Sequence, residues 1–169
     1  MALPTFIPRV SLASAFALLA TAAFAAAPFE GHYRVASHDA KLNFVLAKKG
    51  RPFVGNPVML IVFSEKDGSN ESDPETAART GQLGDAIAAN IMINKNNGDR
   101  WEVINMELSQ TATPRLSKGS FGGSVYLNVD DVSLANGELS GHFTTRPGTT
   151  LMAEEYPLDV DLKFHVRQP

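Results

Sequence analysis

Apolar and polar side chains alternate along most of the chain beyond residue 30. The clearest case is the segment 158–167, where apolar residues occupy every second position and Asp, Lys, His or Arg residues lie between them. A repeat of two indicates a β-strand with one buried face, because a helix would repeat its apolar positions about every 3.6 residues. The segment 40–46 predicts another such strand, with four apolar side chains on one face: Ala40, Leu42, Phe44 and Leu46.

Two further stretches predict central strands. Residues 57–63 read PVMLIVF, a continuous apolar run that is short for a helix and indicates a strand buried on both faces. The segment 85–108 predicts a hairpin whose turn contains Asn96, Asn97 and Gly98, residues that tolerate positive φ angles. Four apolar residues alternate along its first strand: Ile87, Ala89, Ile91 and Ile93.

The segment 64–84 is a long polar connection with one good helix signal. Asp73 is followed by Pro74, which suits the first position of a helix, so we expect a short helix that ends at Arg79. The loop is rich in carboxylates, whose spacing differs from that of an EF-hand calcium loop and favours a solvated acidic loop. These carboxylates are Glu65, Asp67, Glu71, Asp73 and Glu75.

The last third of the chain predicts a hairpin around a two-residue turn, Asn136 and Gly137. In the strand before this turn, Val125, Leu127 and Val129 alternate, and the consecutive acidic residues at 130–131 mark a bulge. On the simplest register, two pairs of residues face each other across the hairpin: Leu134 with Leu139, and Asp131 with His142.

These elements amount to about seven or eight strands joined by turns. They predict an all-β fold, either a single antiparallel β-sandwich or a small β-barrel, with one short helix in a long loop. Two long loops lie between the strands, 64–84 and 109–123, and we expect the second to be mobile because it is rich in Ser, Pro and Gly. Long loops on a rigid β-scaffold often carry recognition.

Residues 1–25 have the layout of a secretory signal peptide. Arg9 precedes an apolar run shorter than the roughly 20 residues of a membrane-spanning helix, and the segment ends in the small-x-small pattern Ala-Phe-Ala. We expect cleavage after Ala25, a single mature domain over 26–169 without a membrane span, and a periplasmic or secreted location. Cleavage after Ala27 and an uncleaved anchor are the alternatives.

Composition narrows the function classes. The chain has no cysteine, which excludes disulfides, thiolate metal ligands and a cysteine nucleophile. Removal of residues 1–25 takes away one Arg and no acid, so 15 basic and 18 acidic residues become 14 and 18, a formal charge of −4. The only tight basic cluster is Lys48, Lys49 and Arg51, which reads as a solvated turn, so we expect no nucleic-acid partner.

One group of titratable residues is a candidate site. His142 is expected on the polar face of its strand, and pairing with the final strand would make a cluster of Asp131, His142, Asp161 and His165 geometrically possible. Two histidines and a carboxylate suffice to bind zinc, and a histidine oriented by a carboxylate is a common general base. Because the chain contains no HExxH pair, solvated surface histidines are the alternative. We therefore assign no cofactor and no catalytic residue and keep the four residues as a candidate cluster.

Common enzyme motifs are absent from the sequence. The segment GRPFVGNP has two glycines at the spacing of a phosphate-binding loop, but Asn56 and Pro57 stand where Lys and Ser or Thr are required. The patterns GxGxxG and GxSxG do not occur.

The segments HYRVASHDAKLNF and LSGHFTT…YPLDVDLKF resemble the periplasmic barrels that bind polyisoprenoids, which would imply a barrel around a long apolar ligand. The overlap consists mainly of strand alternation, so we do not assign the chain to that family. We expect an exported soluble β-domain that binds a small ligand or an envelope protein without catalysis; its oligomeric state is left open. The alternatives are a periplasmic barrel that binds a hydrophobic small molecule, a metal-dependent hydrolase that uses the surface His/Asp cluster, and an immunity or inhibitor protein.

Overall fold

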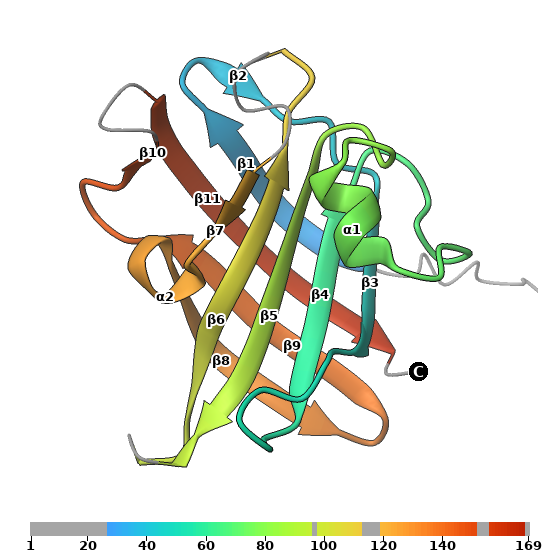
Figure 1. The fold of residues 1–169 in the computed structure, drawn as a ribbon, viewed down its shortest axis with the longest axis vertical. Helices are drawn as coiled ribbons and strands as arrows, with labels where there is room; N and C mark the ends of the chain where they lie inside the picture. Colours follow the sequence, from blue (N-terminus) through green and yellow to red (C-terminus); the bar gives the residue numbers. More distant parts are fainter. Residues whose placement is uncertain (1–26, 96–97, 113–118, 152–155, 168–169) are drawn as a thin grey trace, which may run out of the picture.

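Two antiparallel β-sheets face each other in the computed structural model, and their strands cross (Figure 1). The structure describes residues 27–95, 98–112, 119–151 and 156–167, so the expected signal peptide lies outside the described residues. The mostly β composition confirms the expected fold class. Since the strands form two separate sheets, the arrangement is sandwich-like and is not a closed barrel over the residues that the structure describes.

Sheet A has the strand order β2-β1-β11-β9-β8, and β10 pairs with β11. Its long strand β11 alternates between buried and exposed residues as predicted, because one face packs on the core and the other meets solvent. The bounds are β1 (Phe29–Val35), β2 (His38–Asp39), β8 (Leu127–Ala135), β9 (Glu138–Thr145), β10 (Thr150–Leu151) and β11 (Tyr156–Arg167).

Sheet B is a meander in which each strand pairs with the next along the chain. Every residue of β4 is buried, which confirms the prediction for the apolar run, because one face lies against sheet A and the other against a helix. The bounds are β3 (Phe44–Lys49), β4 (Val58–Ser64), β5 (Ala86–Asn94), β6 (Arg100–Ser109) and β7 (Gly119–Phe121).

The helix α1 (Pro74–Arg79) has its predicted bounds. The Asp73 side chain accepts a hydrogen bond from the backbone N–H of Thr76 (3.0 Å) and so caps the helix. The buried face of α1 packs on the outer side of sheet B and forms a second apolar cluster. This cluster contains Leu60, Val62, Ala77, Ala78, Leu83, Ala86 and Ala88.

A second helix, the single turn α2 (Gly123–Tyr126), was not predicted. It places Val125 67% exposed, so the predicted alternation fails at this residue although Leu127 and Val129 are buried. Gly123 lies against β6, where a Cβ atom would overlap the Val103 side chain. The predicted loop 109–123 therefore contains β7 and the beginning of α2, while its residues 113–118 lie outside the described part of the chain.

The core between the sheets contains a group of aromatic rings. Phe63 of β4 makes edge-to-face contacts with Phe29, Phe143 and Phe164, with ring centroids 5.5 to 6.2 Å apart. Phe143 and Phe164 stack at 5.4 Å. These rings join strands from both sheets, so they link the two layers directly.

The prediction that four apolar residues of 40–46 share one face is wrong. Ala40 and Leu42 pack on the core between the sheets, whereas Leu46 packs on the cluster under α1 and Phe44 is 41% exposed. The reason is that β2 belongs to sheet A and β3 to sheet B, so residues 40–43 cross from one sheet to the other and the alternation restarts.

Both hairpins form where the sequence predicts them. Asn136 and Gly137 have φ of 54° and 76°, and Leu134 pairs with Leu139 as expected. In the β5–β6 hairpin, Gly98 has a positive φ of 68°, whereas Asn96 and Asn97 lie outside the described residues. Of the four alternating residues of β5, Ile87, Ala89 and Ile91 are buried in the core and Ile93 is 37% exposed.

Candidate functional site

The four residues of the predicted His/Asp cluster lie on sheet A, and two of them come together. Strands β9 and β11 pair as expected, and the His142 Nε2 lies 2.7 Å from the Asp161 Oδ1. The hydrogen bond to His142 lowers the pKa of Asp161. His165 instead lies beside Glu138, with 2.9 Å between Nε2 and Oε2.

The register predicted for Asp131 is wrong. The register of β8 shifts between Asp130 and Ser133, so Asp130 is the residue opposite His142. Asp131 lies in this irregularity with φ of 54°. The predicted bulge is therefore present, and it displaces the carboxylate that the simplest register assigns to the cluster.

The outer face of sheet A carries separate pairs rather than one cluster. His32 lies 2.9 Å from Asp159, and Arg34 donates to Asp39 at 2.7 Å. Among the described residues, no group of three or more His, Cys, Asp or Glu side chains is placed to hold one metal ion. These pairs join neighbouring strands of sheet A and so stabilise the pairing of those strands.

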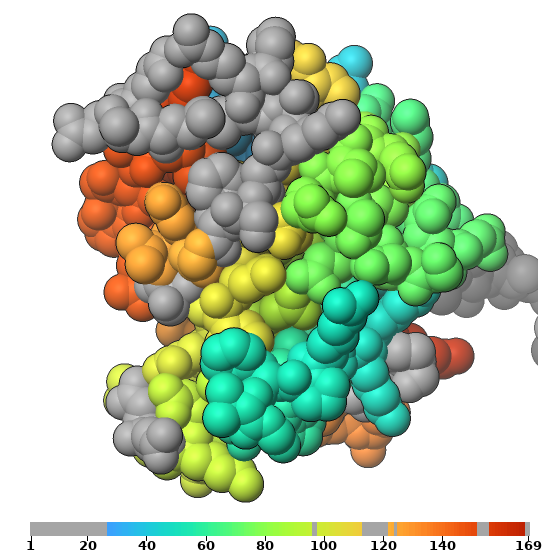
Figure 2. All heavy atoms as spheres, viewed as in Figure 1, coloured from blue at the N-terminus to red at the C-terminus, as the bar shows by residue number. Residues whose placement is uncertain are grey.

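A cleft of about 500 Å³, lined by both polar and apolar side chains, lies on the outer face of sheet B. Figure 2 shows this face hollowed between α1, in green, and the connection from β3 to β4, in teal, with β6, in yellow, at its floor. Its lining comes from three segments: Arg51, Pro52 and Phe53 from the connection; Asp73, Glu75, Thr76 and Arg79 from the helix region; Asn90, Ile104, Asn105 and Glu107 from the two strands.

A network of amides and a carboxylate lies at the base of the cleft. The Asn90 Nδ2 donates to the Glu75 Oε1 at 2.6 Å, and the Asn105 Nδ2 donates to the same oxygen at 3.3 Å. Asn90 Nδ2 also lies 3.3 Å from the Asn105 Oδ1. Glu75 is thus held by two strands, although it belongs to the first turn of α1.

The local register explains why these side chains meet. Asn90 pairs with Asn105, and the next residue, Ile91, pairs with Val103, so Ile104 is an extra residue in β6. Val103 and Met106 are buried in the core, which leaves Ile104 and Asn105 on the cleft side. The bulge therefore directs the amide of Asn105 toward α1.

Asn90 is buried (6% exposed), and its Oδ1 makes no hydrogen bond with the described residues. This oxygen faces Gly50, where a Cβ atom would lie 2.9 Å from it and 2.8 Å from Val58. A glycine at this position therefore leaves the space that the Asn90 side chain occupies. An unsatisfied buried acceptor costs free energy, so its position beneath the cleft requires an explanation other than stability.

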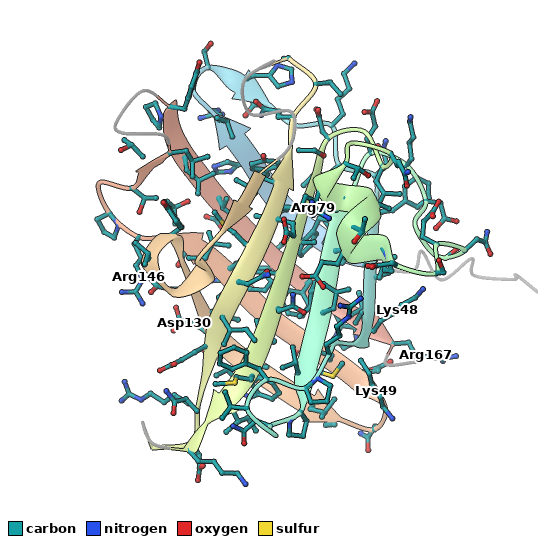
Figure 3. The ribbon with its side chains drawn as sticks, viewed as in Figure 1. Lys48, Lys49, Arg79, Asp130, Arg146 and Arg167 are labelled. Carbon is teal, nitrogen blue, oxygen red and sulfur yellow. The ribbon has the colours of Figure 1, made fainter. Side chains whose placement is uncertain are left out.

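Charged side chains of opposite sign face each other around the cleft. The Arg51 Nη2 lies 3.8 Å from the Asp73 Oδ2. On the opposite side, the Arg79 Nε lies 3.8 Å from the Oε2 of buried Glu107, and Figure 3 places Arg79 on the side of α1 near β6. The hydrogen bond from the Thr76 backbone N–H lowers the pKa of Asp73, so that carboxylate is charged at neutral pH.

The β3–β4 connection forms an exposed apolar turn at the rim of the cleft. Phe53 and Asn56 form a bridge that closes a tight turn over Val54 and Gly55, both at positive φ (48° and 78°). Phe53 is 50% exposed and Val54 is 83% exposed. A β-branched residue in the left-handed region is strained, and such strain is found more often at functional sites than elsewhere.

Only part of this cleft could be identified from the sequence. The loop 64–84, which supplies the side chains of α1, was expected to carry recognition, whereas the strand residues were not predicted. The available signal was the polar residues within apolar strands: Asn90 in AIAANIMI, and Asn105 and Glu107 in VINMEL. Their convergence with Arg51 depends on the pairing of β5 with β6 and on the path of the β3–β4 connection, which no local pattern specifies.

Comparison of the chain with protein-family models, with curated proteins and with solved structures finds no match. Within the described residues, no helix has the length and apolar character needed to cross a membrane.

Proposed function

We propose that this protein is an exported β-domain that binds a small polar ligand in the cleft on sheet B and does not catalyse a reaction on it. The volume of about 500 Å³ is typical of ligand sites, which range from about 300 to 1,000 Å³. The side chains of the cleft bind one another and are held by two paired strands and a helix, an arrangement that suits recognition on a rigid scaffold.

The observation that carries the proposal is the burial of two polar residues under the cleft. Asn90 is 6% exposed and Glu107 is 5% exposed, although both lie on the outer face of the sheet. Neighbouring outer positions on β4 and β5 are apolar and packed under α1, so apolar side chains can fill the outer face of this sheet. Buried polar groups that converge in a cleft on an otherwise apolar sheet face indicate a binding site.

A thermal-shift screen with a blocked cleft tests the proposal. The extra β6 residue lines the cleft, so Ile104→Trp would fill it without removing a polar contact. Ile93→Trp is the matched control, because Ile93 is 37% exposed on β5 and does not line the cleft. The panel contains neutral oligosaccharides, amino acids, short peptides, nucleotides, polyamines, fatty acids and zinc.

We expect at least one member of the panel to raise the Tm of the wild type and of Ile93→Trp but not that of Ile104→Trp. A compound that protects all three proteins equally binds elsewhere, and that result would contradict the proposal. Failure of every compound to protect the wild type would also contradict it.

Export is the second part of the proposal, and the layout of residues 1–25 supports it. Expression of the full chain in a Gram-negative bacterium, followed by intact-mass measurement of the periplasmic fraction, should give a protein that begins at Ala26. A full-length mass confined to the cytoplasm would be incompatible with export.

A further inference from the structure

We infer that the ligand of the cleft is a neutral oligosaccharide. This inference rests on the proposed function, since it assigns a chemical class to the ligand of the same site. Four properties of the cleft support it: its charges of both signs, its mixture of donors and acceptors, its exposed aromatic rim, and its size.

The charges around the cleft disfavour a strongly charged ligand. Each arginine lies beside a carboxylate, Arg51 near Asp73 and Arg79 near Glu107. The remaining carboxylate, Glu75, accepts hydrogen bonds from two amides. An anionic or cationic ligand would therefore meet both signs of charge, and its desolvation would be poorly compensated.

Hydroxyl groups match the polar groups of the cleft. A sugar hydroxyl both donates and accepts, so it can bind a guanidinium N–H, a carboxylate oxygen and either atom of a side-chain amide. The Arg51 and Arg79 contacts with their carboxylates span 3.8 Å, which exceeds hydrogen-bond distance. These guanidinium groups consequently retain N–H donors for a ligand that enters between them.

The rim supplies an apolar surface for the C–H face of a sugar ring. Phe53 is half exposed beside Pro52, and Ile104 lines the cleft from β6. The faces of aromatic rings carry partial negative charge, which favours contact with the weakly positive C–H groups of a pyranose. The two backbone hydrogen bonds between Phe53 and Asn56 hold the backbone of Phe53 at this position.

The size of the cleft favours more than one sugar unit. A volume of about 500 Å³ exceeds that needed by a metal ion or a single small anion. The cleft also opens on the surface between α1 and the β3–β4 connection, so a chain of sugars can extend beyond it (Figure 2).

Isothermal titration calorimetry with defined trisaccharides tests the inference. The probes are maltotriose, cellotriose, mannotriose and chitotriose, with trigalacturonate and the trimer of glucosamine as charged analogues. The variant Phe53→Ala removes the aromatic rim. Phe44→Ala is the matched control, because Phe44 is 41% exposed on the edge strand β3 and does not line the cleft.

We expect at least one neutral trisaccharide to bind more tightly than both charged analogues. Phe53→Ala should weaken this binding about tenfold, which corresponds to about 1.4 kcal/mol, and Phe44→Ala should change it by less than about twofold. Ile104→Trp should abolish the binding without loss of the far-UV circular dichroism spectrum.

Equal effects of Phe53→Ala and Phe44→Ala, tighter binding of a charged analogue, or no binding of any neutral trisaccharide would overturn the inference. These failures differ from a failure of the proposed function. If another class of compound protects the wild type but not Ile104→Trp, the cleft is a binding site and only its assignment to oligosaccharides is wrong.

Discussion

Replacement of Asp85 by Asn should destabilise the protein more than the same carboxylate-to-amide change at any exposed acid. Asp85 is 1% exposed, directly precedes β5 and contacts Lys41 of the segment 40–43, where the chain crosses from sheet A to sheet B. Its Oδ1 accepts hydrogen bonds from the Thr111 backbone N–H (2.7 Å) and hydroxyl (2.8 Å), and its Oδ2 accepts one from the Lys41 N–H (3.1 Å). The His38 Nε2 lies 3.5 Å from Oδ2.

The magnitude follows from these contacts. An Asn side chain keeps one acceptor oxygen, so its amide nitrogen must face either the Lys41 N–H or the two Thr111 donors. At least one charge-assisted hydrogen bond is lost and a backbone donor is left opposite another donor, which costs about 2–4 kcal/mol. For a chain of this length, that loss lowers the Tm by roughly 10 °C.

The pH dependence gives a second readout. Burial opposes ionisation of Asp85, but the N–H groups of Thr111 and Lys41, the Thr111 hydroxyl and His38 together lower its pKa. Because the folded-state pKa is lowered, this contribution to stability is present above the ordinary carboxyl range and is lost as the pH falls through the folded-state pKa. The difference in stability between wild type and Asp85→Asn should therefore shrink between pH 7 and pH 3.

Urea denaturation followed by circular dichroism measures both effects. Asp67→Asn is the matched control, because Asp67 is exposed and its carboxylate accepts one backbone hydrogen bond, from Ser69. It should lower the free energy of unfolding by less than about 0.5 kcal/mol. If Asp85→Asn and Asp67→Asn had equal stability at pH 7, the role assigned to the Asp85 carboxylate would be refuted.

Three further substitutions test local features, each by urea denaturation. Gly31→Ala should lower the free energy of unfolding by about 2–4 kcal/mol, since φ is 114° and a Cβ atom would overlap the Asp161 carbonyl; a neutral effect would contradict this β1–β11 contact. Val54→Asn should raise the free energy of unfolding by about 1 kcal/mol, because Asn tolerates the left-handed region better than Val. A destabilised variant would mean that Val54 is not strained in this turn. Asp73→Ala should lower the free energy of unfolding by about 1 kcal/mol through loss of the hydrogen bond to Thr76, and unchanged stability would argue against the cap.

Much of the strand pattern could be predicted because it is local. The alternation of 158–167, the turn at 136–137 and the capped helix after Asp73 are each specified by residues within a few positions of one another. The bulge was expected at 130–131, but its exact effect on register was not, because a one-residue shift depends on packing against β9. The assignment of Asp131 opposite His142 failed for this reason.

The cleft could not be predicted, since it depends on contacts between distant segments. Arg51, Glu75 and Asn105 come from three separate elements, and only the pairing of β5 with β6 and the docking of α1 bring them together. Phe44 shows the same limit. The spacing of Leu42 and Phe44 would place both side chains on one face of a single strand, but the chain changes sheets there, so Leu42 packs on the core and Phe44 is exposed.

The pairing of β1 with β11 has a consequence for the order of folding. Sheet B consists of neighbours along the chain, so it can form while the chain is still growing, whereas β1 finds its partner only when β11 has been made. Until then β1 and β9 each lack a neighbour, because β11 lies between them. The facing edges of β1 and β9 therefore stay unpaired until late in synthesis. A chain truncated before β11 would be prone to aggregation rather than merely less stable.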